Sequence, residues 1–211
     1  LKTKLFNTKL CIKLFKLSLS YQLDNISFTI RNSGLIIIVG IFFNPIVVGL
    51  ISTSRTLFYF LPIRFMNTID HTVFFEFSKM YGNNDVSSFK KFFKYHIYVN
   101  IFVMIIFSIL SLLFGKLIYN YWTNYEYDLS NNLMLLLIAD TVVFNFFNSL
   151  ETFIKSINKF FYSALLKSLL SILTIILSFT SFTMGYSFLS YFVFSIISSF
   201  IALIFILFNS F

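Results

Sequence analysis

Six long apolar stretches, separated by short polar or turn-forming segments, divide this chain of 211 residues. A helix needs about 20 mostly apolar residues to cross the hydrocarbon core of a bilayer. The fold class that we predict is therefore an all-α membrane protein with six transmembrane helices. The predicted spans are Leu17–Phe43, Pro45–Met80, Tyr98–Leu113, Asn131–Ile154, Ser163–Phe182 and Tyr186–Phe208.

The composition excludes the main soluble classes. Hydrophobic residues make up 58% of the chain and charged residues only 11%, against about 25% charged in ordinary soluble domains. A water-soluble globule could not cover so much apolar surface, and a disordered chain carries far more charge. The excess of Lys and Arg, sixteen against eight Asp and Glu, would suggest nucleic acid in a soluble protein. Here we attribute it to membrane orientation and predict no nucleic-acid partner.

Turn chemistry marks several boundaries. Asn44 followed by Pro45 is typical of a helix N-cap with proline in the first turn. The run from Tyr81 to Asp85 predicts a turn, and residues 119–130 predict a polar, aromatic loop. Residues 1–16 alternate Lys with apolar residues and predict an amphipathic helix on the cytoplasmic membrane surface, with residues 17–211 forming the transmembrane lobe.

The lysines orient the spans. With a cytoplasmic N-terminus, the outside loops carry only Lys116, together with Glu126 and Asp128. All other lysines then fall in cytoplasmic segments, as the positive-inside rule requires. These cytoplasmic lysines are Lys2, Lys4, Lys9, Lys13, Lys16, Lys79, Lys90, Lys91, Lys94, Lys155, Lys159 and Lys167.

The first span has a polar face, which is unusual because polar groups are costly in a membrane. This face carries Ser20, Asp24, Ser27, Arg31 and Gly34, which recur at helical spacing. The opposite stripe is apolar and is predicted to face lipid. It consists of Leu19, Leu23, Ile26 and Ile30.

Folding the second span back on the first at Phe43–Asn44 brings Arg31 and Arg55 to equal depth near mid-membrane. Asp140, in the fourth span, falls at the same depth and completes a predicted central layer. Asp24, Arg64 and Glu151 are predicted nearer the cytoplasm. Arg64 is nine residues from Arg55, half a turn out of phase. Either a kink at Pro62 brings Arg64 to the same cavity, or Arg64 extends to the inner interface.

Two interpretations of the arginines stay open. Arg31 and Arg55 either line a binding cavity or neutralise Asp24 and Asp140 within a packed bundle.

The other candidate residues have simpler interpretations. We predict that Asp70, His71 and Glu76, late in the second span, form a solvated helix end. We predict an interfacial position for His96. Cys11 stands alone and fits no disulfide or metal spacing. The chain has no P-loop, HExxH or GxSxG motif, so we predict neither an enzyme nor a metal or cofactor.

The region from Gly34 to Lys94 resembles a known family. The relevant segments are Gly40–Gly49, Ser52-Thr53-Ser54-Arg55-Thr56-Leu57, Glu76-Phe77-Ser78-Lys79-Met80-Tyr81-Gly82 and Asp85. They are similar to the oligosaccharide (O-antigen) lipid flippases of the multidrug/oligosaccharidyl-lipid/polysaccharide exporter superfamily, except that Phe75 stands where the family usually has proline. The later segments Phe114-Gly115-Lys116, Trp122-Thr123-Asn124 and Ile157-Asn158-Lys159 resemble loops of the same family.

The resemblance implies one lobe, the C-terminal half, of a transporter with about twelve spans. It implies an undecaprenyl-pyrophosphate-linked oligosaccharide, an O-antigen or capsule repeat unit, flipped across the bacterial cytoplasmic membrane by alternating access. Membrane lipids, a glycan polymerase and glycosyltransferases are the implied partners. Arg55 matches the family run directly. Depth and helix face add the other predicted substrate-binding residues, Arg31, Arg64, Asp24 and Asp140.

Two alternatives remain at this point. A multidrug or cation antiporter of the same superfamily would use an aromatic cavity, to which Tyr59, Phe60 and Phe147 could contribute. A cavity dominated by arginine would repel cationic drugs, which favours the flippase. The second alternative is a non-transporting membrane scaffold in polysaccharide assembly, which the absence of a recognisable soluble domain disfavours.

Overall fold

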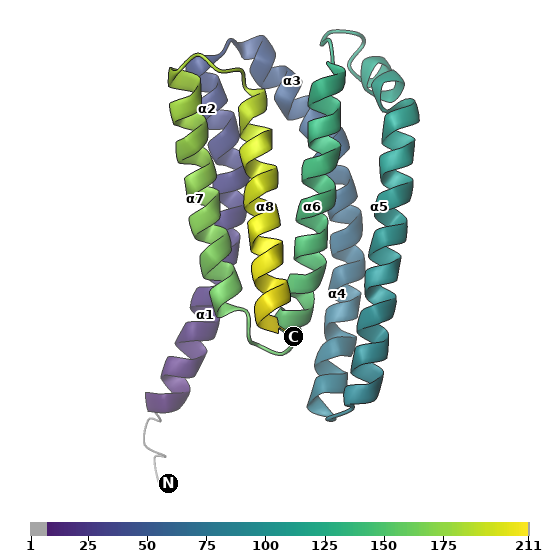
Figure 1. Ribbon diagram of the computed structural model, residues 1–211, viewed down its shortest axis with the longest axis vertical. Helices are drawn as coiled ribbons and strands as arrows, with labels where there is room; N and C mark the ends of the chain where they lie inside the picture. The colour runs from purple at the N-terminus through teal and green to yellow at the C-terminus, as the bar shows by residue number, and fades with distance from the viewer. Residues whose placement is uncertain (1–7, 211) are drawn as a thin grey trace, which may run out of the picture.

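Helix is the only regular secondary structure in the part of the chain that the computed structural model describes, residues 8–210. Within it, six helical segments are long and apolar enough to cross a membrane. Figure 1 shows them running side by side along the long axis of one bundle. The predicted all-α fold with six helices able to span a membrane is confirmed. The segments are Leu10–Phe42, Pro45–Gly82, Val86–Trp122, Asn131–Ser156, Phe161–Thr183 and Leu189–Phe208.

Each of the first two spans is one long helix interrupted by a π-helical turn. The first consists of α1 (Thr8–Thr29), the π-turn η1 (Ile30–Gly34) and α2 (Leu35–Phe42). The second consists of α3 (Pro45–Arg55), the π-turn η2 (Thr56–Phe60) and α4 (Leu61–Gly82). The remaining spans are uninterrupted helices, namely α5 (Val86–Trp122), α6 (Asn131–Ser156), α7 (Phe161–Thr183) and α8 (Leu189–Ser210).

The turn chemistry predicts the connections well. The Asn44 side chain accepts a hydrogen bond from the Val47 amide at 3.0 Å, which confirms the N-cap before Pro45. The turn after α4 is also confirmed, and Asn84 there adopts a left-handed conformation with φ of 55°. Asparagine tolerates this conformation better than most residues. Asp85 then caps α5 by accepting from the Ser88 amide at 3.1 Å.

Several predicted boundaries differ from the structure, most of all in the third span, which runs from Val86 to Trp122 and not from Tyr98 to Leu113. The predicted loop from Tyr119 is wrong for its first residues, because α5 continues to Trp122 and the loop covers only residues 123–130. Tyr119 is buried and its hydroxyl lies 2.8 Å from that of Thr53, which holds the end of α5 in the bundle. At the N-terminus, α1 runs from Thr8 past Leu17 without a break. Residues 1–7 of the predicted amphipathic segment lie outside the described residues.

The helices form two groups that meet along α6 and α8. The first span packs on α7, and α7 packs on α8, whereas α4 and α5 pack on α6. Figure 1 shows α1 and α4 on opposite sides of the bundle at the end that carries the N-terminus. We call this the N-terminal end. Because the two spans are joined at Phe43–Asn44, they diverge from the opposite end towards the N-terminal end.

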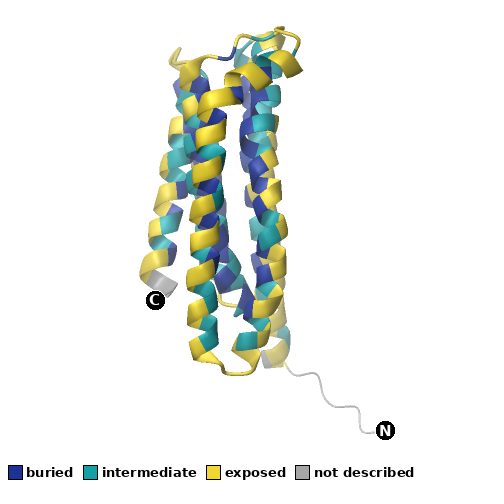
Figure 2. Cartoon of the chain, turned by 90° about the vertical axis from the view of Figure 1, so that its right-hand side faces the viewer, coloured by how far each residue is buried: buried dark blue, intermediate teal, exposed yellow. Residues whose placement is uncertain are grey.

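Burial follows the pattern of a protein surrounded by lipid. In Figure 2, buried positions follow the inner sides of the helices, and exposed positions continue along their outer sides. On α5, large apolar side chains such as Phe102, Leu113 and Leu117 are exposed, as expected where hydrocarbon is the solvent. In the first span Ser20, Ser27 and Arg31 are buried, whereas Leu19 and Ile26 of the apolar stripe are exposed and Leu23 and Ile30 are partly buried. The predicted two-faced first span is therefore confirmed in part.

Candidate functional site

The two π-turns place the arginines of the first two spans inside the bundle. Arg31 lies within η1, and Arg55 directly precedes η2. A π-turn disturbs the regular hydrogen bonding of the helix and often marks a functional site. At η1, the Tyr191 hydroxyl of α8 donates to the Arg31 carbonyl at 2.6 Å. Another helix thus stabilises the irregular turn.

Pro62 explains the corresponding contact at η2. Proline has no amide hydrogen, so Pro62 cannot donate to the carbonyl four residues earlier, that of Phe58. The Thr141 hydroxyl of α6 donates to this carbonyl at 2.7 Å instead. Pro62 and the π-turn together account for the irregularity that the sequence predicts between Arg55 and Arg64.

Arg31 forms a buried ion pair with Asp140. Its Nη2 lies 2.5 Å from Asp140 Oδ1, and its Nη1 donates to Ser199 Oγ at 2.7 Å. Ser195 Oγ donates to the same Asp140 oxygen at 3.0 Å. Arg31 is 7% exposed and Asp140 2% exposed. The structure therefore brings together two members of the predicted central layer, and in this conformation Asp140 neutralises Arg31.

Arg55 has a different environment. Its guanidinium donates to the carbonyl and to the side-chain oxygen of Asn32, at 3.2 Å and 2.5 Å. Arg55 is only 3% exposed, yet none of the carboxylates that the structure describes lies within ion-pair distance of it. The contact confirms that Arg55 of the second span and Asn32 of the first span lie at the same depth along the bundle.

Both guanidinium groups lie near the ring of Tyr59, at 5.9 Å for Arg31 and 5.1 Å for Arg55. We call Arg31, Asn32, Arg55, Tyr59 and Asp140 the central layer. Within the described part of the chain, Arg31 Nε, Asn32 Nδ2 and the Tyr59 hydroxyl are buried without a hydrogen-bond partner. The first two of these groups can only donate. The central layer therefore has two guanidinium groups for one carboxylate and a surplus of hydrogen-bond donors.

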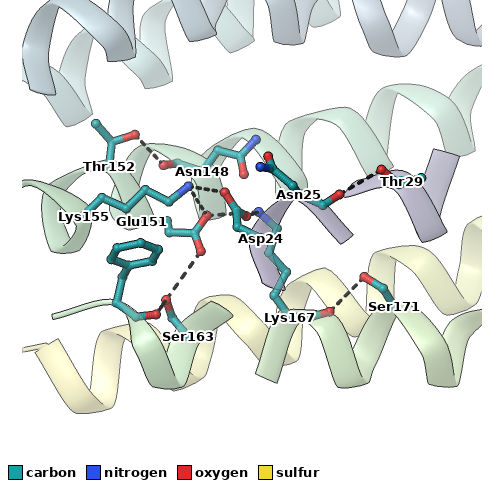
Figure 3. A network of polar contacts seen from close by, with 11 residues as sticks. Asp24, Asn25, Thr29, Asn148, Glu151, Thr152, Lys155, Ser163, Lys167 and Ser171 are labelled. Carbon is teal, nitrogen blue, oxygen red and sulfur yellow. Dashed lines mark hydrogen bonds and ion pairs between the residues drawn. The ribbon is translucent and has the colours of Figure 1, made fainter. Parts of the chain in front are cut away.

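A second charged cluster lies closer to the N-terminal end. Figure 3 shows Lys155 and Lys167 reaching Asp24 and Glu151 from α6 and α7. Lys155 Nζ and Lys167 Nζ each lie 2.6 Å from a different oxygen of Asp24. The same nitrogens lie 3.1 Å and 3.0 Å from Glu151 Oε2. We call these four residues the lysine cluster, in which two carboxylates balance two ammonium groups.

The lysine cluster corrects one prediction. Asp24 does not neutralise an arginine, because both of its oxygens face lysines. The sequence argument assigned Lys155 and Lys167 to cytoplasmic segments and missed their role. Both lie inside helices, since α6 extends to Ser156 and α7 begins at Phe161. The spacing of Glu151 and Lys155, four residues apart on one helix face, was the available signal.

A cleft of about 480 Å³ opens between α1 and α4, with α6 and α7 as its floor. Lys155 and Lys167 line it together with further polar residues, and Phe144 forms part of its wall. The guanidinium of Arg31 lies 4.3 Å from the centre of the Phe144 ring. Phe144 thus lies between the cleft and the central layer. The further polar lining residues are Asp24, Asn25, Asn67, Asp70, His71, Asn148 and Thr152.

The remaining predicted site residues lie elsewhere. Arg64 is exposed on α4 and joins neither cluster. Three residues were predicted at a solvated helix end: His71 and Glu76 are exposed, whereas the prediction is wrong for Asp70, which is 5% exposed. The interfacial position predicted for His96 is also wrong, because His96 is 3% exposed and lies against Asp70. Both residues are buried because α5 packs along α4 and α6 over this region.

Comparisons with family models, curated proteins and solved structures gave no match to this chain. The resemblance to the oligosaccharide lipid flippases stays a prediction. The functional argument therefore depends on the central layer, the lysine cluster and the cleft.

Proposed function

We propose that this chain is one lobe of a two-lobe transporter that flips a lipid-linked oligosaccharide across the bacterial cytoplasmic membrane by alternating access. The proposed cargo is an undecaprenyl-pyrophosphate-linked repeat unit of O-antigen or capsule. The observation that carries this proposal is the surplus of positive charge and unpartnered donors in the central layer. Arg55 is its main element, since it is buried without a carboxylate among the described residues.

The chemistry of a pyrophosphate group matches this surplus. Its oxygens carry negative charge and only accept hydrogen bonds, and guanidinium groups bind such oxygens in pairs at a fixed geometry. A low-dielectric interior strengthens the interaction. Arg55 would bind the phosphate directly, while Asp140 holds Arg31 in position when the cargo is absent. The protein thus offers an anion a site that hydrocarbon does not.

The cleft supplies a route to this layer. In the proposed orientation the N-terminal end is cytoplasmic, so the cleft admits a headgroup from the inner leaflet between α1 and α4. Lys155 and Lys167 line the cleft and would meet the phosphate first, in competition with Asp24. Passage to Arg31 then requires the ring of Phe144 to turn aside. The second lobe, the glycan polymerase and the glycosyltransferases belong to this proposal as partners.

One observation favours a second candidate, a cation or drug antiporter. The cleft wall includes Asp70 and the aromatic residues Tyr21, Phe28, Phe74 and Phe75, a combination that suits an apolar cation. The aromatic residues that the sequence argument assigned to this role, Tyr59, Phe60 and Phe147, do not line the cleft. Export of a cationic dye by the full-length protein, unaffected by loss of Arg55, would favour this candidate.

The decisive experiment measures flipping of a fluorescent polyprenyl-pyrophosphate sugar by the full-length protein in proteoliposomes. We expect Arg55→Gln to lower the rate by about tenfold or more, because a charged hydrogen bond to the phosphate is lost. Arg55→Lys should restore only part of it, since lysine lacks the planar pair of donors. Arg64→Gln, which removes an exposed arginine, is the matched control. Flipping at the normal rate by Arg55→Gln would contradict the proposal.

A further inference from the structure

Two hollows lie in line between α5 and α8 on the outer surface of the bundle. Both helices pack on α6, which lies between them in Figure 1 and forms the floor of the hollows. Their volumes are about 380 Å³ and 300 Å³, and they share Phe146 of α6. The larger hollow lies nearer the N-terminal end, between Phe93 and Ile97 of α5 and Leu203 and Leu207 of α8. We call it the apolar groove.

The lining of both hollows suits hydrocarbon. Every described residue that lines the apolar groove is apolar. Among the described lining residues of the smaller hollow Ser108 alone is polar, and its hydroxyl donates to the Met104 carbonyl at 2.7 Å. A polar occupant would therefore lose its hydrogen bonds to water and gain none from these side chains.

Two lysines lie where the apolar groove reaches the N-terminal end. Lys90 and Lys94 precede Ile97 by seven and three residues, and they therefore lie on the same face of α5 as Phe93 and Ile97. Both lysines are exposed, and none of the carboxylates that the structure describes lies within ion-pair distance of either. Lys94 Nζ lies 5.7 Å from the centre of the Tyr98 ring, and tyrosine is typical of a membrane–water interface.

The opposite end of α5 has a different charge balance. The lysine there is Lys116, and its Nζ lies 4.0 Å from Asp128 Oδ1. The uncompensated positive charge of α5 is therefore concentrated at the N-terminal end. An apolar groove with positive charge at one end complements a molecule that has a hydrocarbon chain and an anionic headgroup.

The apolar groove lies on the side of α6 that faces away from the cleft. Phe144 and Asn148 of α6 line the cleft, whereas Phe146 and Leu150 line the groove. Residues two apart on a helix differ in direction by about 200°. The proposed route of the cargo therefore does not pass the groove. This separation favours a lipid of the surrounding bilayer over the hydrocarbon chain of the cargo.

We propose that the apolar groove binds a glycerophospholipid with an anionic headgroup, with one acyl chain between α5 and α8 and the phosphate in contact with Lys90 and Lys94. Ammonium groups donate charge-assisted hydrogen bonds to phosphate oxygens. Basic pockets between membrane helices on the cytoplasmic side suit anionic lipid headgroups, and in the predicted orientation this end is cytoplasmic. The site goes beyond the proposed function and does not depend on it.

The test follows thermal unfolding of the purified full-length protein in detergent during titration with one of two lipids. Phosphatidylglycerol is anionic, and phosphatidylcholine has no net charge. A ligand that binds only the folded state raises the unfolding temperature. Because two lysines contribute, we expect phosphatidylglycerol to reach its half-effect at a concentration lower by about tenfold or more. Equal half-effect concentrations for the two lipids overturn the proposal.

The role of the lysines is tested with two double variants of equal charge. Lys90→Gln with Lys94→Gln should raise the half-effect concentration of phosphatidylglycerol to that of phosphatidylcholine. The control is Lys79→Gln with Lys91→Gln, because Lys79 lies on α4 and Lys91 is turned about 100° from Lys90 around α5. All four lysines are exposed, so neither variant alters the core. Equal losses in both double variants overturn the proposal.

The groove itself is tested with two tryptophan variants of α8. Leu207 lines the groove and Ile204 does not, although both are exposed. Leu207→Trp should raise the half-effect concentration of phosphatidylglycerol by about tenfold, as loss of about two buried CH₂ groups would. Ile204→Trp should leave this concentration unchanged. Equal behaviour of the two variants overturns the proposal.

Two further results would assign the groove to another occupant. If light scattering shows a dimer that Leu207→Trp separates while lipid binding is unchanged, a second copy of the chain fills the groove. If a polyprenyl phosphate binds more tightly than phosphatidylglycerol and loses affinity in the same variants, the chain of the cargo fills it. Either result overturns the proposal of a phospholipid.

Discussion

Arg31 Nη2 lies 2.5 Å from Asp140 Oδ1, and this contact joins the π-turn of the first span to the middle of α6. Both residues are buried, and α8 adds two hydrogen bonds, one between Ser199 and Arg31 and one between Ser195 and Asp140. Three helices that are distant in sequence therefore converge on a single pair of opposite charges. Both side chains are largely shielded from the surroundings, with 9% of Arg31 and 3% of Asp140 exposed.

Asp140→Asn should lower the free energy of unfolding by about 3–5 kcal/mol, because it leaves the Arg31 guanidinium buried and uncompensated. Arg31→Met should cost a similar amount for the same reason. The double variant should be more stable than the sum of the two losses predicts. Denaturant unfolding in detergent measures all three. Strict additivity would show that the pair has no energetic coupling.

Glu151→Gln should destabilise the protein more than Asp24→Asn. Both changes leave the two lysines with one carboxylate, but Glu151 is fully buried, whereas the Asp24 side chain is 18% exposed at the cleft. Water in the cleft partly replaces Asp24 as a partner for the lysines, and it cannot reach Glu151. The unfolding temperatures of the two variants in detergent check the order, and the reverse order would contradict it.

Thr141→Val should cost about 1 kcal/mol through loss of the hydrogen bond to the Phe58 carbonyl. The cost arises because Pro62 supplies no amide hydrogen to that carbonyl. In a Pro62→Ala background, where the backbone offers an amide hydrogen, Thr141→Val should cost less. A double-mutant cycle by thermal unfolding measures the coupling. Equal costs in both backgrounds would show that Thr141 does not replace the missing bond.

Gly115→Ala should destabilise the packing of α5 on η2 by about 1–3 kcal/mol, as overpacking of a tight core does. A β-carbon at Gly115 would lie 2.7 Å from Cε1 of the Phe58 ring and 3.4 Å from the Met134 sulfur. Gly82→Ala is the matched control, because a β-carbon there meets nothing within 4 Å. Similar unfolding temperatures for the two variants would contradict the prediction.

The helical spans were predictable because their signals are local. Length and hydropathy locate the six spans, and Asn44 with Pro45 marks the hairpin between the first two. Simple depth arithmetic on that hairpin correctly places Arg55 level with the π-turn of the first span. The same local signals fail at Tyr119, where no helix-breaking residue intervenes but the polarity of the segment suggests a loop. Its hydroxyl contact with Thr53 is a tertiary feature that local pattern does not contain.

The partners of the charged groups were less predictable. Depth correctly placed Arg31 and Asp140 in one layer, but it did not say which of the two arginines Asp140 would contact. Depth and helix face failed for Asp24, since lysines near helix ends were expected to face water, whereas long side chains can also turn inward to a carboxylate. They failed for Asp70 and His96, because burial there depends on α5 lying across α4 and α6. The spacing of apolar residues along one helix does not reveal how that helix packs against others.

The two π-turns determine where the chain can tolerate the loss of a single residue. Each π-turn accommodates one residue more than a regular helical turn, so deleting one residue from η1 would rotate everything beyond it by about 100°. The buried face of α2 would then turn towards lipid, and the hairpin at Asn44 would lose its register with α3. An alignment of true relatives should therefore show gaps in the connecting turns and none within residues 30–34 or 56–60.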